Sequence, residues 1–230
     1  PESEIYHKSD VLYGIYQAKR AITQQDCCIL VEGYTDVISM HQSGVENVVA
    51  SSGTSLTEGQ IRLISRFTKN VTVIYDGIKA SLRGIDMILR EGLNVRTVLL
   101  PDGDDPDSFA RKHNATELQD FLLTHEEDFI SFKTHLLLAE AQGDPLKKAA
   151  LISDIVQSIS VIPNEITRSV YIHECAKQME IDEEVLVREV TLKRVERSAG
   201  SEAKEFVRRQ HILHGNATTN QNFGTSYPKQ

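Results

Sequence analysis

Three apolar segments of this chain each end at acidic residues, and this pattern limits the possible fold more than any other feature. Segments of this length that are rich in valine and isoleucine are typical of buried strands. The segments and the acidic residues that follow them are 27–31 with Glu32, 71–75 with Asp76, and 95–100 with the stretch 102–107. Stretches with helical periodicity separate them, so the sequence predicts an α/β fold in which helices cover both faces of a parallel sheet.

The acidic residues that follow the strands are expected to gather at one edge of this sheet. In a parallel α/β sheet, ligands bind outside the carboxyl ends of the strands. Carboxylates brought together there repel each other, and a bound divalent cation with oxygen ligands relieves that repulsion. The pattern therefore indicates a metal-dependent site at the carboxyl edge of the sheet.

Five motifs of the chain resemble the Toprim region of bacterial DnaG-type DNA primases. They are the segments Glu32-Gly33-Tyr34-Thr35-Asp36-Val37, Tyr75-Asp76-Gly77, 100–107, the entry segment His7-Lys8-Ser9 with Leu12-Tyr13-Gly14, and the Gly-Thr segment 50–57. Together they span roughly residues 5–113, in the order and with the spacing that the family has. The resemblance implies a Toprim-type parallel sheet flanked by helices, followed by an all-α helical subdomain.

The chain divides into four parts on this interpretation. Residues 1–25 form a lead-in segment with one helix, 26–113 the Toprim catalytic domain, 114–195 the helical subdomain, and 196–230 a linker or disordered tail. No strand is expected after residue 107, because the apolar residues there follow helical periodicity. The tail is predicted from its frequent serine, glycine, asparagine and glutamine residues.

The resemblance assigns an acid/base role in nucleotidyl transfer to Glu32. It implies that Lys8, Gly53 and Thr54 contact nucleotide phosphate or nucleic acid, through a charged amine, backbone amides and a hydroxyl. Asp36 lies one helical turn beyond Glu32. It either supports the site or simply favours the first turn of a helix, and the sequence leaves both interpretations open.

Asp76, Asp105 and Asp107 are the predicted ligands of a bound Mg²⁺ or Mn²⁺. Magnesium suits a shallow carboxylate site, because it keeps several waters and shares phosphate oxygens. Pro106 is expected to keep Asp105 and Asp107 in one extended segment with their carboxylates side by side. The chain departs from the family after Asp76-Gly77, where the usual second aspartate and its small loop are missing. A second metal ion would therefore have one ligand fewer.

The net charge of −8 argues against a simple nucleic-acid-binding module, because phosphate contacts need lysine and arginine. In the family, much of the basic surface belongs to a subdomain that precedes Toprim, and the resemblance places that subdomain outside these residues. The three cysteines lack zinc-binding spacing, so zinc is expected only in a domain outside this chain, and a reducing cytoplasm is the natural location. No apolar run is long enough to span a membrane.

The leading hypothesis is the catalytic part of a DNA primase. Such an enzyme would synthesise short RNA primers on single-stranded DNA from ribonucleoside triphosphates, and would meet the replicative helicase through a domain outside these residues. Two alternatives remain: a Toprim nuclease or topoisomerase fragment that cleaves phosphodiester bonds, and a non-enzymatic recombination-mediator scaffold that binds DNA. The Gly-Thr and His-Lys segments favour the primase. The fold alone does not choose among the three.

Overall fold

The computed structural model describes most of the chain, in five stretches. They are residues 8–51, 56–75, 82–101, 103–141 and 144–217. Within these stretches only the backbone is described for residues 8, 82–83, 140 and 201–217. Among the described helices, none has the length and apolar character that crossing a membrane requires.

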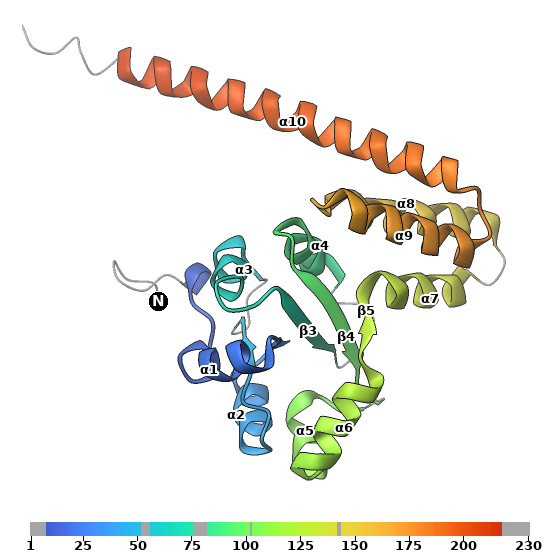
Figure 1. The fold of residues 1–230 in the computed structure, drawn as a ribbon. Helices are drawn as coiled ribbons and strands as arrows, with labels where there is room; N and C mark the ends of the chain where they lie inside the picture. The colour runs from blue at the N-terminus through green and yellow to red at the C-terminus, as the bar shows by residue number, and fades with distance from the viewer. Residues whose placement is uncertain (1–7, 52–55, 76–81, 102, 142–143, 218–230) are drawn as a thin grey trace, which may run out of the picture.

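A five-stranded sheet forms the centre of the first part of the chain (Figure 1). Its strands are β1 (Cys28–Val31), β2 (Val48–Ala50), β3 (Asn70–Tyr75), β4 (Asn94–Leu99) and β5 (Glu127–Asp128). Their spatial order is β2-β1-β3-β4-β5, with β1 to β4 parallel and β5 antiparallel to β4. The parallel strands β1, β3 and β4 confirm the sheet that the sequence predicts, and β2 joins it beside β1.

The prediction that no strand follows residue 107 is wrong at β5, a two-residue strand at the edge of the sheet. Arg96 pairs with Asp128, and Thr97 pairs with Glu127. Asp128 also accepts hydrogen bonds from the amides of Ile130 and Ser131 at the start of α7 (Phe129–Ala141). A link of two acidic residues between helices shows no apolar alternation, so only its tertiary contact with β4 makes it a strand.

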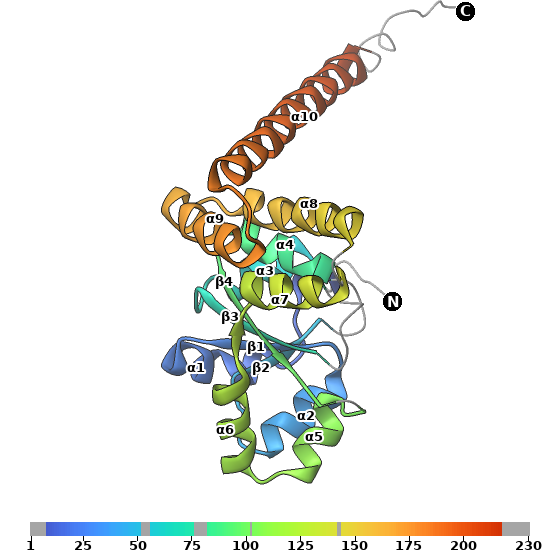
Figure 2. The same cartoon turned by 90° about the vertical axis from the view of Figure 1, so that its right-hand side faces the viewer.

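Helices cover both faces of the sheet, as predicted (Figure 2). They are α3 (Glu58–Ile64) and α4 (Leu82–Arg90) on one face, and α2 (Tyr34–Gln42), α5 (Pro106–Lys112) and α6 (Ala115–His125) on the other, while α1 (Ile15–Gln25) precedes β1. Neighbouring residues of a strand point to opposite faces. Leu30 and Val73 therefore join the apolar core with α3 and α4, whereas Val31 and Ile74 join the core with α2, α5 and α6.

The second part of the chain is helical, as predicted. Besides α7 it contains α8 (Pro145–Val161), α9 (Glu165–Met179) and α10 (Glu183–Ala217), which pack together, and α8 also contacts α4. Residues 196–217, for which we predict a linker or disordered tail, are helical and belong to α10. Extending a formed helix costs less than nucleating one, and the stretch 202–209 is rich in good helix formers. Residues 218–230 lie outside the described residues.

Three arginines, which we call the arginine cluster, join α9 and α10 to the end of α8. They are Arg168 of α9 and Arg194 and Arg197 of α10. Over 2.7–3.2 Å, they donate hydrogen bonds to the backbone carbonyls of Ser160, Ile162 and Pro163. The C-terminus of a helix carries partial negative charge. The arginine cluster therefore fixes the last two helices to α8 by charge-assisted hydrogen bonds.

Candidate metal site

The carboxyl ends of β1, β3 and β4 meet at one edge of the sheet, as the sequence predicts. Leu30 of β1 pairs with Val73 of β3, and Tyr75 of β3 pairs with Leu99 of β4. Glu32 directly follows β1 at this edge, and its side chain is exposed. Four predicted site groups lie outside the described part of the structure and stay predictions: Gly53, Thr54, Asp76 and the side chain of Lys8.

Asp36 closes the first turn of α2. Its Oδ2 accepts a hydrogen bond from the Gly33 amide over 2.9 Å, which confirms the interpretation of Asp36 as a first-turn residue. The side chain is buried, and this burial raises the pKa of Asp36 above its ordinary value. The charges of Asp105 and Asp107 raise that pKa further. Asp36 therefore shares one electrostatic environment with two of the predicted metal ligands.

Asp105 caps α5 instead of lying in an extended acidic segment. Its Oδ1 accepts a hydrogen bond from the Ser108 amide over 2.6 Å, and its own amide donates to Ser108 Oγ over 3.0 Å. Only Asp105 is extended, because Pro106 is the first residue of α5 and Asp107 lies in its first turn. The predicted extended segment from Asp105 to Asp107 is wrong. Proline restricts the residue before it, while its own φ fits the start of a helix.

Asp107 is held by two donors that sequence reasoning missed. Its Oδ1 accepts hydrogen bonds from Ser39 Oγ of α2 and from Arg111 Nε of α5, the latter over 2.9 Å. The bond from Ser39, and then the bond and charge of Arg111, lower the pKa of Asp107 below its ordinary value. Asp107 is therefore ionised at neutral pH. Arg111 stands four residues after Asp107, a helical spacing that the sequence offers, whereas Ser39 has no such signal.

We call Asp36, Asp105 and Asp107 the acidic cluster; these carboxylates lie at the starts of α2 and α5, the helices that follow β1 and β4. The atoms that could bind a metal in this cluster are all carboxylate oxygens, which Mg²⁺ and Mn²⁺ prefer as ligands. Burial, and then the charges of Asp105 and Asp107, raise the pKa of Asp36, and a bound cation would offset the contribution of those charges. The described side chains form no complete group of three metal ligands, and Asp76 is not among them. The residues present thus fit a divalent cation in their chemistry.

Tyr75, the last residue of β3, has a buried hydroxyl without a hydrogen-bond partner among the described residues. Only 4% of the residue is exposed. Extending the pairing of Leu30 with Val73 by two residues places Glu32 beside Tyr75 on the same face of the sheet. Burial, and then the charge of Glu32, raise the pKa of Tyr75 above its ordinary value. A buried hydroxyl without a hydrogen-bond partner lowers the free energy of unfolding, so Tyr75 is a residue at which the fold loses stability.

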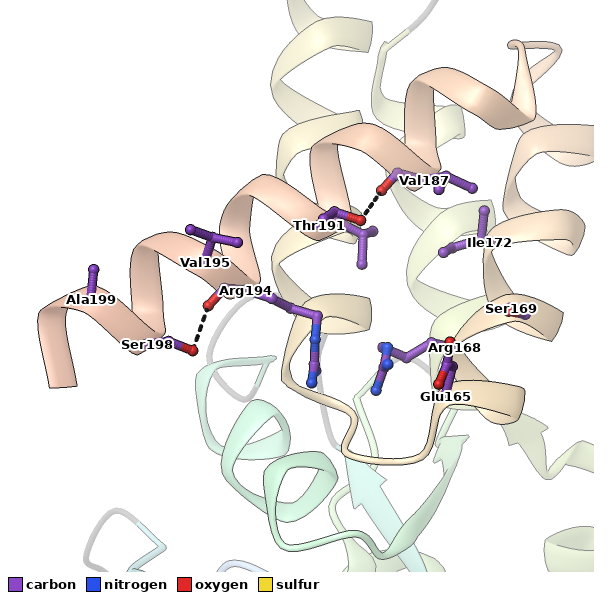
Figure 3. A pocket seen from close by; sticks show the side chains of 11 residues that line it. Glu165, Arg168, Ser169, Ile172, Val187, Thr191, Arg194, Val195, Ser198 and Ala199 are labelled. Carbon is purple, nitrogen blue, oxygen red and sulfur yellow. Dashed lines mark hydrogen bonds between the residues drawn. The ribbon is translucent and has the colours of Figure 1, made fainter. Parts of the chain in front are cut away.

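A pocket of about 650 Å³ lies between α9 and α10, in the helical part of the chain (Figure 3). Figure 3 shows Arg168 and Arg194 reaching into it from the two helices, with Ile172 and Val187 among the apolar side chains of its wall. Burial lowers the pKa of Arg168, and the charge of Arg194 lowers it further. The pocket contains none of the predicted site residues, and its arginines bind the end of α8, so it belongs to the packing of the helices.

Two protein-family models match the chain. A Toprim-like model matches residues 29–110, which include most of β1, all of β2 to β4 and most of α5. A model described as the DnaB-helicase binding domain of primase matches residues 141–184, which include α8 and α9. We expect contact with the helicase through a domain outside this chain, whereas the second matching model lies within it.

Curated relatives and solved structures agree with these matches. A DNA primase of Halalkalibacterium halodurans is 32% identical over 82% of this chain and 32% of its own length. A DNA primase of Aquifex aeolicus is 40% identical over 56% of this chain and 27% of its own length. The chain thus spans about a third of the length of the curated relatives it matches.

Among solved structures, a DNA primase domain from Pseudomonas aeruginosa aligns with a TM-score of 0.71 at 27% identity, covering 83% of this chain and 62% of that one. A structure of the DnaG primase catalytic domain bound to single-stranded DNA aligns with a TM-score of 0.66 at 31% identity, covering 77% and 59%. These matches favour the primase hypothesis over the two alternatives.

Proposed function

Because the chain belongs to the bacterial DnaG-type primase family, we propose that it forms part of a catalytic core that synthesises RNA primers on single-stranded DNA. In this reaction the 3′-hydroxyl of the primer attacks the α-phosphate of a ribonucleoside triphosphate, and pyrophosphate leaves. A bound Mg²⁺ or Mn²⁺ supplies the charge that activates the hydroxyl and neutralises the phosphate oxygens. The work of such an enzyme at the replication fork places it in the cytoplasm.

The acidic cluster is the observation that carries this proposal. Asp105 and Asp107, together with Asp76, would hold the cation, since the ionised Asp107 offers charge and oxygen donors at neutral pH. Asp36 would keep the start of α2 in place through its bond to the Gly33 amide. The carboxylates come from two helices, so the packing of α2 against α5 sets the spacing between them.

Glu32 would act on the proton of the attacking hydroxyl. Its exposed carboxylate stands directly after β1, at the edge where the strands of the site end. A positioned acid/base group contributes about 10²–10⁴-fold in rate. Lys8, Gly53 and Thr54 would contact the triphosphate or the nucleic acid.

The proposed partners follow from the same family membership. A related catalytic domain was solved with single-stranded DNA, and we assign that template to this chain as well. Because the net charge is −8, much of the basic surface for the template would come from residues beyond this segment. The match over residues 141–184 supports contact with the replicative helicase. Zinc would belong to a separate domain, as in the Aquifex aeolicus structure that contains zinc binding and RNA polymerase domains.

Primer synthesis by the full-length protein tests this function. Glu32→Gln keeps the size of the side chain and removes its charge, so primer yield on a single-stranded template should fall by about 10²–10⁴-fold. The melting temperature should stay almost unchanged, because an exposed charge contributes about 1 kcal/mol or less to stability. Glu46→Gln is the matched control, since Glu46 is also exposed but precedes β2 at the opposite end of the strands.

The outcomes separate the hypotheses. Wild-type yield from the Glu32→Gln protein would remove the acid/base role. A wild-type protein that cleaves DNA and makes no primer, with both Mg²⁺ and Mn²⁺ tried, would instead favour the nuclease alternative.

A further inference from the structure

Two serine hydroxyls, that of Ser39 within α2 and that of Ser43 just after its last residue, bridge to α5, and they bind different kinds of acceptor. Ser39 Oγ donates to the side-chain Oδ1 of Asp107, and Ser43 Oγ donates to the backbone carbonyl of Ala110 over 3.1 Å. Ser39 is 5% exposed, so its hydroxyl sits in a fixed environment between the two helices. The same helix contact thus contains one bond to a candidate metal ligand and one bond to backbone.

The two oxygens of the Asp107 carboxylate differ in their hydrogen-bond partners. Oδ1 accepts from Ser39 and from Arg111, whereas Oδ2 has no hydrogen-bond or ion-pair partner among the described residues. Two donors on one oxygen fix the rotation of the carboxylate and leave the other oxygen available. Partners of this kind orient metal-binding side chains in known metal sites, and removing one commonly costs about 10–100-fold in metal affinity or activity.

Of the two donors, Ser39 is the better fixed. The Arg111 side chain is 69% exposed, so water competes for its bond and screens its charge. Ser39 is buried on α2, the helix that also carries Asp36 of the acidic cluster. We propose that Ser39 is a positioning residue for Asp107, holding Oδ1 so that Oδ2 is presented to a divalent cation. This inference rests on the proposed function, because it requires Asp107 to bind that cation.

A purely structural role for Ser39 would be to join α2 to α5, and Ser43 tests for that role. Ser39→Ala and Ser43→Ala each remove one hydroxyl bridge to α5, but only Ser39→Ala removes a donor from Asp107, which then keeps only its bond from Arg111 among the described residues. The probe is Mn²⁺ alone, titrated by calorimetry into the full-length protein, with Asp107→Asn defining the heat that belongs to this site. Thermal unfolding without metal records the packing effect of each variant.

Ser39→Ala should weaken Mn²⁺ binding at the Asp107-dependent site by about tenfold. Ser43→Ala should leave that affinity unchanged within about twofold, while both variants lower the metal-free melting temperature by similar small amounts. Ser39→Thr keeps the hydroxyl donor and should bind Mn²⁺ as the wild type does. Primer synthesis should follow the affinity, with a loss in the Ser39→Ala protein that high Mn²⁺ concentration restores.

Other results overturn the proposal in distinguishable ways. If Ser39→Ala and Ser43→Ala weakened Mn²⁺ binding equally, the role of Ser39 would be limited to packing α2 against α5. A folded Ser39→Thr protein that binds as weakly as Ser39→Ala would show that the hydroxyl is not what matters. Wild-type affinity in Ser39→Ala, with binding lost in Asp107→Asn, would reject the positioning role and keep the metal site. Unchanged Mn²⁺ binding in Asp107→Asn would reject the metal site itself.

Discussion

The acidic cluster and the arginine cluster are assembled in the same way at opposite kinds of helix end. The carboxylates gather at the N-termini of α2 and α5, and the guanidiniums gather at the C-terminus of α8. Each sign of charge meets the helix end that favours it. Burial is the main cause of the raised pKa of Asp36 and of the lowered pKa of Arg168, and repulsion from the like charges of each cluster adds to both shifts.

The clusters differ in what balances their charge. All three arginines donate to carbonyls of one helix end, so their charge becomes a contact between α8, α9 and α10. In the acidic cluster, by contrast, Asp107 Oδ2 has no hydrogen-bond partner in the described part of the chain. On the other face of the sheet, the buried Tyr75 hydroxyl also lacks a partner among the described residues. A gathering of like charges therefore indicates a ligand only where the surrounding protein leaves polar atoms unpaired.

The largest stability effect is expected in the arginine cluster. Arg194→Gln shortens the side chain so that it no longer reaches the Ser160 and Ile162 carbonyls. Hydrogen bonds from charged groups contribute about 1.5–3 kcal/mol, and the free energy of unfolding should fall by a similar amount. Chemical denaturation measures this change, and primer synthesis below the melting transition should stay at the wild-type level.

Arg188→Gln is the control for that variant. Arg188 lies on the same helix, is exposed and touches Glu189 only at 3.9 Å, so its loss should change stability by about 0.5 kcal/mol or less. An Arg194→Gln protein with unchanged stability and lost primer synthesis would break the comparison, because the arginine cluster would then be a functional site.

A smaller effect of opposite sign is expected at Tyr75. Tyr75→Phe removes a buried hydroxyl that has no described partner, so the free energy of unfolding should rise by about 1 kcal/mol. Tyr171→Phe is the matched change in the helical part, where the hydroxyl donates to Asp128 Oδ2 over 2.5 Å. That variant should lose about 1–3 kcal/mol, because Asp128 keeps an unpaired oxygen. Losses of equal size in the two proteins would show that Tyr75 is paired in solution.

The smallest predicted effect is a pH-dependent change in melting temperature at Asp36. Folding raises the pKa of this carboxyl, so its stabilising contribution is complete below the ordinary aspartate pKa of about 3.9 and is lost as the pH rises through the folded-state pKa. Asp36→Asn keeps an oxygen for the Gly33 amide without the charge. The variant should therefore melt a few degrees above the wild type at pH 7, with a difference that disappears toward about pH 4.

Melting curves of the two proteins between about pH 4 and pH 8 test this expectation. An Asp36→Asn protein that melts below the wild type across the whole range would show that the attraction of the charge to the start of α2 outweighs its repulsion by Asp105 and Asp107. The acidic cluster would then resemble the arginine cluster in using its charge for stability.

Much of the fold follows from short-range features of the sequence. Valine-rich runs with helical segments between them specify the parallel strands β1, β3 and β4, because burial of an apolar run and the two-residue alternation of a strand are local properties. The same logic places Glu32 at the end of β1 and lets Thr57 cap α3, where its Oγ1 accepts from the Gln60 amide over 3.2 Å. The contact of Arg111 with Asp107 could also be predicted from the sequence, since Arg111 lies one helical turn after Asp107.

The tertiary structure alone decided which groups meet. Ser39 and Asp107 are 68 residues apart in the sequence, and Arg194 and Ser160 are 34 residues apart. Separations of this size follow no helical or strand periodicity, so the sequence does not predict either hydrogen bond. The strand β5 likewise depends on its pairing with β4, which only folding supplies. Local patterns fix where each element begins and which face it buries, because those preferences act within a few residues. Which carboxylate is oriented, and by what donor, depends on how whole helices pack.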